Sequence, residues 1–298
     1  MVREVVAHLR PERGGLYFDG TIGGGGHSEA ILEAGTDTRV IGVDRDPEAV
    51  EEARRRLERF SGRVRLVRGD YAEVAESWRE PLAGALLDLG VSSHQIDDVG
   101  RGFTFREAAP LDMRMGGASA SAPTAADLLN EMPEAALADV FYRYGEERRS
   151  RRLAAEVVRR RKVRPLRTSD DLVSALVRAL GPKVGPQDKA RIFQAVRIAV
   201  NDELTSLERA LAALRERLEA GGVLAVISYH SLEDRRVKVS FREWSLACVC
   251  PPELPVCQCR GKPLGELLTR KPESASAEEV ARNARARSAH LRAWRKAA

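Results

Sequence analysis

Short apolar segments alternate with helical ones through the first hundred residues, and this alternation restricts the fold more than any other feature of the chain. The expected strands are residues 15–19, 39–44, 63–67 and 83–88, and the expected helices include residues 27–33 and 47 to about 60. The fourth strand is apolar along its length, as in strands buried on both faces of a parallel sheet. Such alternation predicts a doubly wound α/β domain that binds ligands at the carboxyl ends of its strands.

The pattern becomes helical in the middle of the chain. Apolar residues fall at helical spacing from Thr124 to about Ala199, and no segment there alternates as a strand does. A helix at residues 204–218 and an apolar strand at residues 223–228 then resume the α/β pattern. The sequence therefore predicts an α/β domain made of residues 1–103 and 200–298, interrupted by an all-helical substrate-recognition insertion at residues 104–199.

A glycine-rich loop follows Asp19, the last residue of the first predicted strand. Glycines there let the backbone approach a ligand at a helix N-terminus, and Gly24, Gly25 and Gly26 are the candidate contacts. The loop lacks the G-x-G-x-x-G spacing of nicotinamide-binding loops. Asp19 would repel a pyrophosphate, but it suits a ligand with a positive amino group. S-adenosylmethionine has an ammonium, a sulfonium and no phosphate, so it is the predicted cofactor.

Polar residues also follow the next three predicted strands. Asp44 ends the second strand, at about the spacing where an acid accepts hydrogen bonds from ribose hydroxyls. Tyr71 follows the third strand, where an aromatic ring could hold adenine, and Asp88 ends the fourth, near the expected reactive methyl. Each acid alone could instead be a helix cap or a turn residue. Together they favour a nucleoside-containing cofactor.

The formal net charge of +5 is unevenly distributed. Residues 143–167 contain 11 Lys or Arg and 3 Asp or Glu, residues 260–298 contain 10 and 4, and residues 1–142 contain 16 and 25. Because arginine binds phosphate through a planar fork, RNA contacts are predicted at one local cluster. This predicted cluster consists of Arg148, Arg149, Arg151, Arg152 and residues 159–162. The alternative is a solvated helix face in a chain whose codon usage favours arginine.

No apolar run approaches the ~20 residues needed to cross a bilayer, which excludes a membrane-spanning protein. Residues 1–13 lack the apolar core of a secretory signal, so a cytoplasmic protein is expected. The motif C-x-C-x6-C-x-C contains Cys248, Cys250, Cys257 and Cys259. Four thiols this close could hold a structural zinc ion, although two-residue spacings are more typical. Free thiols or a reversible disulfide are the alternatives.

Several longer segments resemble the bacterial ribosomal RNA small subunit methyltransferase H family, and the resemblance extends over nearly the whole chain. The segments are residues 19–28, 86–93 with Gln95, 101–103, 110–115, 193–198 with 200–204, 230–235 and 283–288. The resemblance implies a Rossmann-like class I enzyme that uses S-adenosylmethionine to methylate the exocyclic 4-amino group of a decoding-centre cytidine in 16S rRNA. By position, the family's cofactor contacts fall on Gly25, Gly26, His27, Asp44, Tyr71, Asp88 and Gln95.

A cytosine 4-amino nitrogen is a poor nucleophile because its lone pair is delocalised into the ring. Transfer therefore needs in-line geometry and a hydrogen-bond acceptor for the amino group, and Asp88 is the first candidate for that acceptor. No cysteine lies near these motifs, so a covalent attack on the ring has no obvious nucleophile. Residues 89–91 are Leu-Gly-Val, whereas DNA amino-methyltransferases have Pro-Pro-aromatic, which argues against a DNA substrate.

Asp112, His230 and Asp234 are further candidates for substrate contact or proton removal. Each also has a structural interpretation: Asp112 could pair with Arg114 or another basic residue, and His230 could help cap a helix whose expected N-cap is Ser231. Two other protein classes compete with a methyltransferase. The broken glycine spacing disfavours a nucleotide-dependent oxidoreductase, and only the basic segments support a non-catalytic RNA-binding module.

Overall fold

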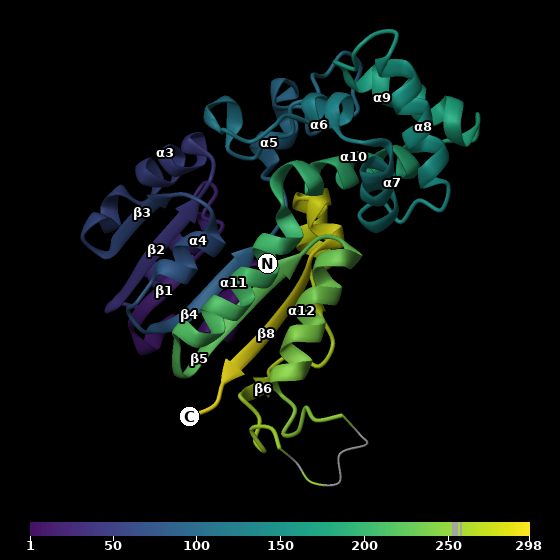
Figure 1. Ribbon diagram of the computed structural model, residues 1–298. Coiled ribbons are helices and arrows are strands. Elements are labelled where there is room, and N and C mark those ends of the chain that lie inside the picture. Colours follow the sequence, from purple (N-terminus) through teal and green to yellow (C-terminus); the bar gives the residue numbers. More distant parts are fainter. Residues whose placement is uncertain (252–255, 257) are drawn as a thin grey trace. The chain divides into compact units, whose positions relative to one another are not determined.

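A computed structural model describes residues 1–251, 256 and 258–298 of the 298-residue chain. The chain forms two compact units, one made of residues 1–90 with 204–298 and the other of residues 91–203 (Figure 1). The boundaries predicted at 103/104 and 199/200 differ from these. Residues 91–103 belong to the second unit because Gln95 and Arg101 donate hydrogen bonds to the Met115 carbonyl and Phe103 packs on that unit's core.

The first unit contains an eight-stranded mixed sheet with the order β3-β2-β1-β4-β5-β8-β6, and β7 also pairs with β8. Its strands are β1 Gly15–Asp19, β2 Thr38–Asp44, β3 Val64–Arg68, β4 Leu82–Asp88, β5 Leu218–Ser228, β6 Gly265–Leu267, β7 Glu273–Ser274 and β8 His290–Lys296. Strands β1 to β5 are parallel, and β8 runs antiparallel to β5. Since β1 to β3 extend one way and β4 and β5 the other, the strand order reverses between β1 and β4, which creates a topological switch point.

Helices cover both faces of this sheet. They are α1 Val2–Leu9, α2 Gly26–Ala34, α3 Pro47–Arg56, α4 Tyr71–Ser77, α11 Glu203–Arg217, α12 Ser231–Trp244 and α13 Ala277–Arg282. One apolar core joins Phe18 and Leu87 to helices α4, α11 and α12, and Figure 1 shows α11 and α12 along the same face. A second core joins Tyr17 and Leu86 to helices α1 and α2. Neighbouring strand residues thus enter opposite cores, which confirms that these strands are buried on both faces.

The second unit is helical, with one isolated antiparallel bridge between Pro110 and Thr168. Its helices are α5 Ser93–Asp97, α6 Ala125–Glu131, α7 Glu134–Arg143, α8 Ser150–Arg161, α9 Ser169–Leu180 and α10 Pro186–Asn201. A core of its own, including Leu129, Phe141 and Ile192, holds them together. No helix in the described ranges is long and apolar enough to span a bilayer.

The doubly wound α/β fold with added helices is confirmed, including Pro47 at the first position of α3. Two expectations are corrected. Helix α3 ends at Arg56, and a 3₁₀ segment occupies Glu58–Arg63. The N-cap of α12 is His230 rather than Ser231, because the His230 backbone is extended and its Nδ1 accepts the Glu233 N–H at 3.4 Å.

Candidate functional site

Three aspartates end three neighbouring strands at the topological switch point. Asp44 ends β2, Asp19 ends β1 and Asp88 ends β4, and these strands are adjacent in the order β2-β1-β4. Burial is the largest cause that raises the pKa of Asp19 and of Asp44, and neighbouring charge adds to it: that of Asp88 on Asp19 and that of Asp19 on Asp44. The sheet topology therefore gathers negative charge at the edge where doubly wound folds bind ligands.

The glycine loop between β1 and α2 is held by its backbone. Gly20 N–H donates to the Leu86 carbonyl at 2.9 Å, and Gly23 N–H donates to Asp44 Oδ2 at 3.0 Å. Gly20 must lack a side chain, because a Cβ there would lie 2.5 Å from the Leu87 side chain. Gly25 has φ 81° and is the N-cap of α2, so it can supply no side-chain cap to the first N–H groups of that helix.

Helix α3 gives the other glycines of the loop a packing role. A Cβ on Gly24 would lie 2.7 Å from Glu52 Oε1, and one on Gly26 would lie 3.1 Å from an Arg56 nitrogen. One on Gly25 would contact Leu57 at 3.4 Å, the residue between α3 and the 3₁₀ segment that follows it. Close approach of the loop to this helix therefore accounts for part of the glycine pattern, alongside any ligand contact.

Asp19 is almost completely buried, with 1% of its surface exposed. It accepts a hydrogen bond from the Ser28 hydroxyl at 2.6 Å and another from Thr21 N–H at 3.2 Å. Burial nevertheless raises the pKa of Asp19, because these two hydrogen bonds offset only part of the desolvation. The carboxylate thus anchors both ends of the glycine loop as well as adding negative charge to the site.

Asp44 lies at the other side of the loop and is partly buried. Its two oxygens accept N–H groups from Asp46, at 2.9 Å, and from Gly23, at 3.0 Å. Burial raises the pKa of Asp44 to about 6, which means that desolvation outweighs both hydrogen bonds. Each oxygen still has a second lone pair, so the carboxylate can accept further hydrogen bonds from a ligand.

Asp88 is held between an imidazole and a phenol. The Tyr229 hydroxyl donates to Asp88 Oδ1 at 2.9 Å, and His27 Nδ1 lies 3.5 Å from Asp88 Oδ2. Burial raises the pKa of Asp88, while His27 and Tyr229 act in the opposite direction. Burial and the neighbouring carboxylate together raise the pKa of Tyr229, so it stays a hydrogen-bond donor.

His27 leaves one polar atom unsatisfied. Its Nε2 is buried, and no partner for it occurs within the parts of the chain that the structure describes. A buried polar atom without a hydrogen bond costs stability, and such atoms in native proteins are often completed by water or a ligand. This nitrogen lies beside the acidic edge, at the start of α2.

Tyr229 was not predicted from the sequence as a site residue. It follows Ser228, the last residue of β5, and β5 is the neighbour of β4 in the sheet. The rule that drew attention to Asp44 and Asp88, that ligands bind at the ends of parallel strands, applies equally to this position. Extending that rule to the fifth strand would have found it.

The remaining predicted residues of the first unit have structural partners. Tyr71 is the first residue of α4, next to Asp70, whose side chain caps that helix and pairs with Arg45. Asp234 receives two hydrogen bonds from Arg292, at 2.7 and 3.0 Å. His230 Nε2 lies 3.0 Å from a carboxylate oxygen of the same helix.

Two predicted residues belong to the second unit. Gln95 forms a capping box with Ser92 at the start of α5 and donates to the Met115 carbonyl at 3.3 Å. Asp112 receives two hydrogen bonds from the Arg114 guanidinium, at 2.9 and 2.7 Å. Burial acts to raise the pKa of Asp112, but the Arg114 hydrogen bonds and charge outweigh it and keep that pKa below its ordinary value.

The structure brings three of the four cysteines together. The sulfur atoms of Cys248, Cys250 and Cys259 lie within 4.8 Å of one another in the segment between α12 and β6. Cys257, the fourth member of the predicted zinc set, lies outside the described residues.

Comparison with known proteins identifies the family. The MraW methylase family profile matches residues 1–297, almost the full chain. The chain belongs to the MraW methylase family. A relative from Gemmatimonas aurantiaca named "Ribosomal RNA small subunit methyltransferase H" is 58% identical over 285 residues, covering 94% of this chain and 89% of that protein. A Heliobacterium modesticaldum relative of the same name is 48% identical over 305 residues, covering 99% of this chain and 97% of its own.

This methylase uses S-adenosylmethionine as its methyl donor, and the acidic edge of the sheet fits that molecule. Burial raises the pKa of Asp19, Asp44 and Asp88, which means that the protein's own hydrogen bonds and charges do not fully offset the desolvation of the three carboxylates. A ligand that carries an ammonium and a sulfonium and no phosphate supplies the missing positive charge. An oxidoreductase coenzyme with a pyrophosphate would add negative charge at the same place.

Proposed function

We propose that this methylase transfers a methyl group from S-adenosylmethionine to the exocyclic 4-amino group of a decoding-centre cytidine in 16S rRNA. The strongest support is the set of full-length relatives named as small-subunit ribosomal RNA methyltransferases. The geometry adds a chemical reason for an amino acceptor, because Asp88 presents a partly exposed carboxylate at the switch point. When an amino group acts as a nucleophile, it needs a nearby group such as this carboxylate to accept a hydrogen bond from its N–H.

Four side chains of the first unit would hold the methyl donor. Asp44 would accept hydrogen bonds from the ribose hydroxyls, and the Tyr71 ring would contact the adenine. Asp19 and Asp88 would supply negative charge to the cationic part of the molecule. Gly25 and the first N–H groups of α2 would line the same side of the ligand. When bound, S-adenosylmethionine supplies an electrophilic methyl group on a sulfonium.

Asp88 would activate the acceptor nitrogen. Tyr229 occupies Oδ1 as a donor, which leaves lone pairs on Oδ2 for an N–H of the cytosine amino group. A hydrogen bond to that N–H localises the lone pair on nitrogen and favours attack on the methyl carbon. Once the N–C bond forms and the S–C bond breaks, the nitrogen carries one proton too many. Asp88 Oδ2 would take that proton.

A labelled-methyl assay on small ribosomal subunits tests this function. Wild type is expected to produce N4-methylcytidine, and Asp88→Asn is expected to lower kcat by about 10²–10⁴-fold, because the amide cannot take the proton. Asp37→Asn, which makes the same change of charge at an exposed position, is the matched control. Label on carbon 5, on a ribose or only in transfer RNA would refute the substrate assignment. The Kd of S-adenosylmethionine, measured for the same variants, separates the two roles of Asp88, because loss of a cofactor contact would raise this Kd and loss of a proton acceptor would not.

The predicted arginine cluster divides into two groups in the second unit. Arg160 and Arg161 are engaged internally, since Arg160 bonds Glu156 and Ser174, and Arg161 bonds the Leu129 and Met132 carbonyls. Arg149 and Arg159 are exposed but also bonded, to the Leu180 carbonyl and to Glu156. The four other exposed members remain candidates for phosphate contacts: Arg148, Arg151, Arg152 and Lys162.

A surface pocket lies beside part of this arginine cluster. It has a volume of about 400 Å³ and is lined by Arg152, Arg159 and Arg178 with Glu156 and two alanines. Arg159 already forms two hydrogen bonds with Glu156, at 2.8 and 2.7 Å, so Arg152 and Arg178 are the stronger candidates for binding a phosphate there. Planar guanidinium groups suit the fork-like recognition of a phosphate.

Filter binding to 16S rRNA at several salt concentrations tests the RNA contact. Arg151→Gln with Arg152→Gln is expected to weaken binding and to reduce the slope of log K against log salt by about 0.7–0.9 for each phosphate that the variant no longer neutralises. The control is Arg54→Gln with Arg55→Gln on α3, two exposed arginines of the other unit. Equal slopes for the two double variants would favour the solvated-face alternative.

A further inference from the structure

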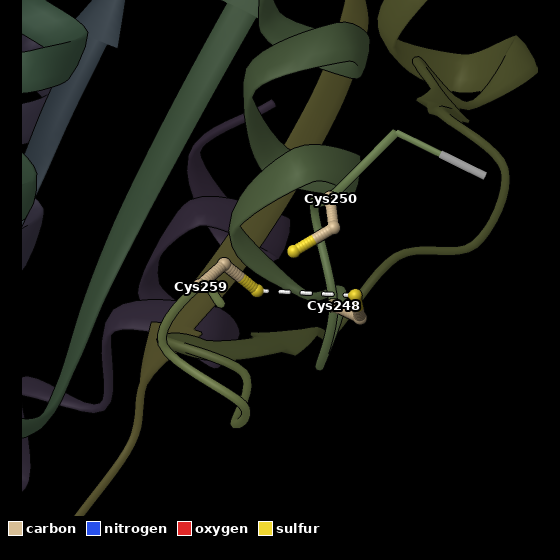
Figure 2. Close-up of side chains that lie close together, drawn as sticks. All are labelled: Cys248, Cys250 and Cys259. Atoms are coloured by element: carbon tan, nitrogen blue, oxygen red, sulfur yellow. Dashed lines mark hydrogen bonds between the residues drawn. The ribbon is translucent and has the colours of Figure 1, made fainter. Parts of the chain in front are cut away.

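We propose that Cys248, Cys250 and Cys259 bind a structural zinc ion through their thiolates. Figure 2 shows the three side chains converging, with their sulfur atoms turned toward one another. The three residues come from both ends of the segment that links α12 to β6, so a shared ion would close that segment into a loop. Cys257 lies outside the described residues, and the three placed sulfurs alone define the site.

The spacing of the sulfurs suits a single tetrahedral ion. A Zn–S bond of about 2.3 Å at the tetrahedral angle places two ligand sulfurs about 3.8 Å apart. The Cys259 and Cys248 sulfurs are 3.8 Å apart, and all three lie within 4.8 Å of one another. A four-iron cluster would hold its cysteines farther apart, because each sulfur then binds a different iron. Soft thiolate donors disfavour magnesium or calcium.

Backbone N–H groups also point at two of the sulfurs. Val249 N–H donates to Cys259 Sγ at 3.3 Å, and Gln258 N–H donates to Cys250 Sγ at 3.4 Å. In each of these bonds, a backbone N–H beside one group of cysteines donates to a sulfur of the other group, so the chain near Cys248 and the chain near Cys259 are linked in both directions. Such donors stabilise a thiolate over a thiol and form the outer shell that orients metal ligands.

The described part of the surrounding segment has few apolar contacts, although Arg260 bonds the Glu243 and Leu246 carbonyls. Leu246, Val249 and Val256 are 43%, 40% and 68% exposed, so its apolar side chains contribute little to any core. The ends are fixed by a hydrogen bond from Leu264 N–H to the Trp244 carbonyl, at 2.8 Å. A metal ion would cross-link the loop by replacing the thiol protons with Zn–S bonds, which converts binding energy into local order.

The position of the loop indicates a structural role for the ion. Helix α12 begins directly after the carboxyl end of β5 and runs 14 residues, about 21 Å, to Trp244. The cysteines follow Trp244, and the neighbouring strand β6 pairs with the Lys296 end of β8, beside the amino end of β5. The ion would therefore lie at the opposite end of the sheet from Asp88 and take no part in methyl transfer.

Metal analysis of the full-length protein, purified without chelator, tests the proposal. We expect about one zinc per chain in wild type and in Lys262→Ala, and less than about a tenth of that in Cys248→Ser with Cys259→Ser. Lys262→Ala changes the same loop without removing a ligand. Wild type without zinc, or a double variant that keeps its zinc, would overturn the site. Iron with sulfide, or an intact mass showing a disulfide in the freshly purified protein, would also overturn it.

Two measurements on the wild-type chain keep the test independent of how the variants fold. Cobalt added to the metal-free protein is expected to give the intense visible bands of a tetrahedral site with a sulfur-to-cobalt charge-transfer band. Weak octahedral bands would refute the geometry. Trypsin is expected to cut after Arg260 at least about tenfold faster once zinc is removed, because local order then falls. Unchanged cleavage would show that no metal orders the loop.

Discussion

Replacing Tyr229 by phenylalanine should shift the pH dependence of methyl transfer. The change removes the hydroxyl that donates to Asp88 Oδ1 at 2.9 Å and leaves the ring in place. A hydrogen bond to a charged group contributes about 1.5–3 kcal/mol, and one pKa unit corresponds to about 1.36 kcal/mol. Since the Asp88 side chain is 24% exposed, the lower half of that range applies. The pKa of Asp88 should therefore rise by about one unit.

The sign of the effect follows from which form the phenol stabilises. Tyr229 donates to the carboxylate, so its loss disfavours the ionised form and raises a pKa that burial has already raised. If the carboxylate is the form that accepts the amino proton, the acid limb of kcat/KM against pH moves to higher pH by about one unit. Well above that limb, wild type and variant should have similar rates.

The assay is methyl transfer to small subunits over a range of pH, with the Kd of S-adenosylmethionine measured at each pH. Tyr17→Phe is the matched control, because its buried hydroxyl lies 3.3 Å from the Leu9 and Arg10 carbonyls and has no link to Asp88. It should lower stability without moving the limb. An acid limb that stays in place in Tyr229→Phe, or moves equally in both variants, would refute the role assigned to Asp88.

Three further predictions concern stability and donor binding. Burial raises the pKa of Asp44 from 3.8 to about 6, so between pH 4 and 6 the folded state binds this proton more tightly than the unfolded state. The unfolding free energy of wild type should therefore fall as pH rises from 4 to 6. Urea titrations of Asp44→Asn should show a fall that is smaller than that of wild type by at most about 3 kcal/mol. Asp234→Ala leaves the buried Arg292 without its carboxylate partner and should cost about 3–5 kcal/mol, whereas Glu76→Ala breaks an exposed ion pair and should leave the denaturation midpoint nearly unchanged; equal denaturation midpoints for the two variants would contradict this. Gly25→Ala and Gly181→Ala both force a side chain to positive φ and should each cost about 1–2 kcal/mol, but only Gly25→Ala should weaken S-adenosylmethionine binding measured by calorimetry.

Local patterns were sufficient to predict the central strands and helices. The apolar runs that became β1, β2 and β4 are buried on both faces of a parallel sheet, so their composition is continuous and easy to recognise. Strand β8 escaped prediction because charges interrupt it. Arg292 on β8 is only 7% exposed, and it can be buried there because Asp234 of α12 pairs with it. A partner 58 residues away cannot be recognised from the strand itself.

The candidate site was predictable to the same extent. Acids at strand ends could be found one strand at a time, because the end of a predicted strand is a local feature. Tyr229 could not be linked to Asp88 in this way, since their contact joins residues 141 positions apart. The opposite case is Asp112, whose pairing with Arg114 was predictable because the two residues are only two positions apart, and the Arg114 guanidinium bonds both of its oxygens.

The amino-acid sequence by itself determined the alternation of strands and helices, the glycine loop, the strand-end acids and the cysteine motif. Each depends on neighbours along the chain: periodicity, turn chemistry and spacing. Only the tertiary structure decided how these pieces combine. The strand order set three carboxylates side by side, burial raised the pKa of each, and folding brought the Cys259 sulfur to within 3.8 Å of the Cys248 sulfur. Desolvation and through-space charge depend on distances that exist only in the folded chain.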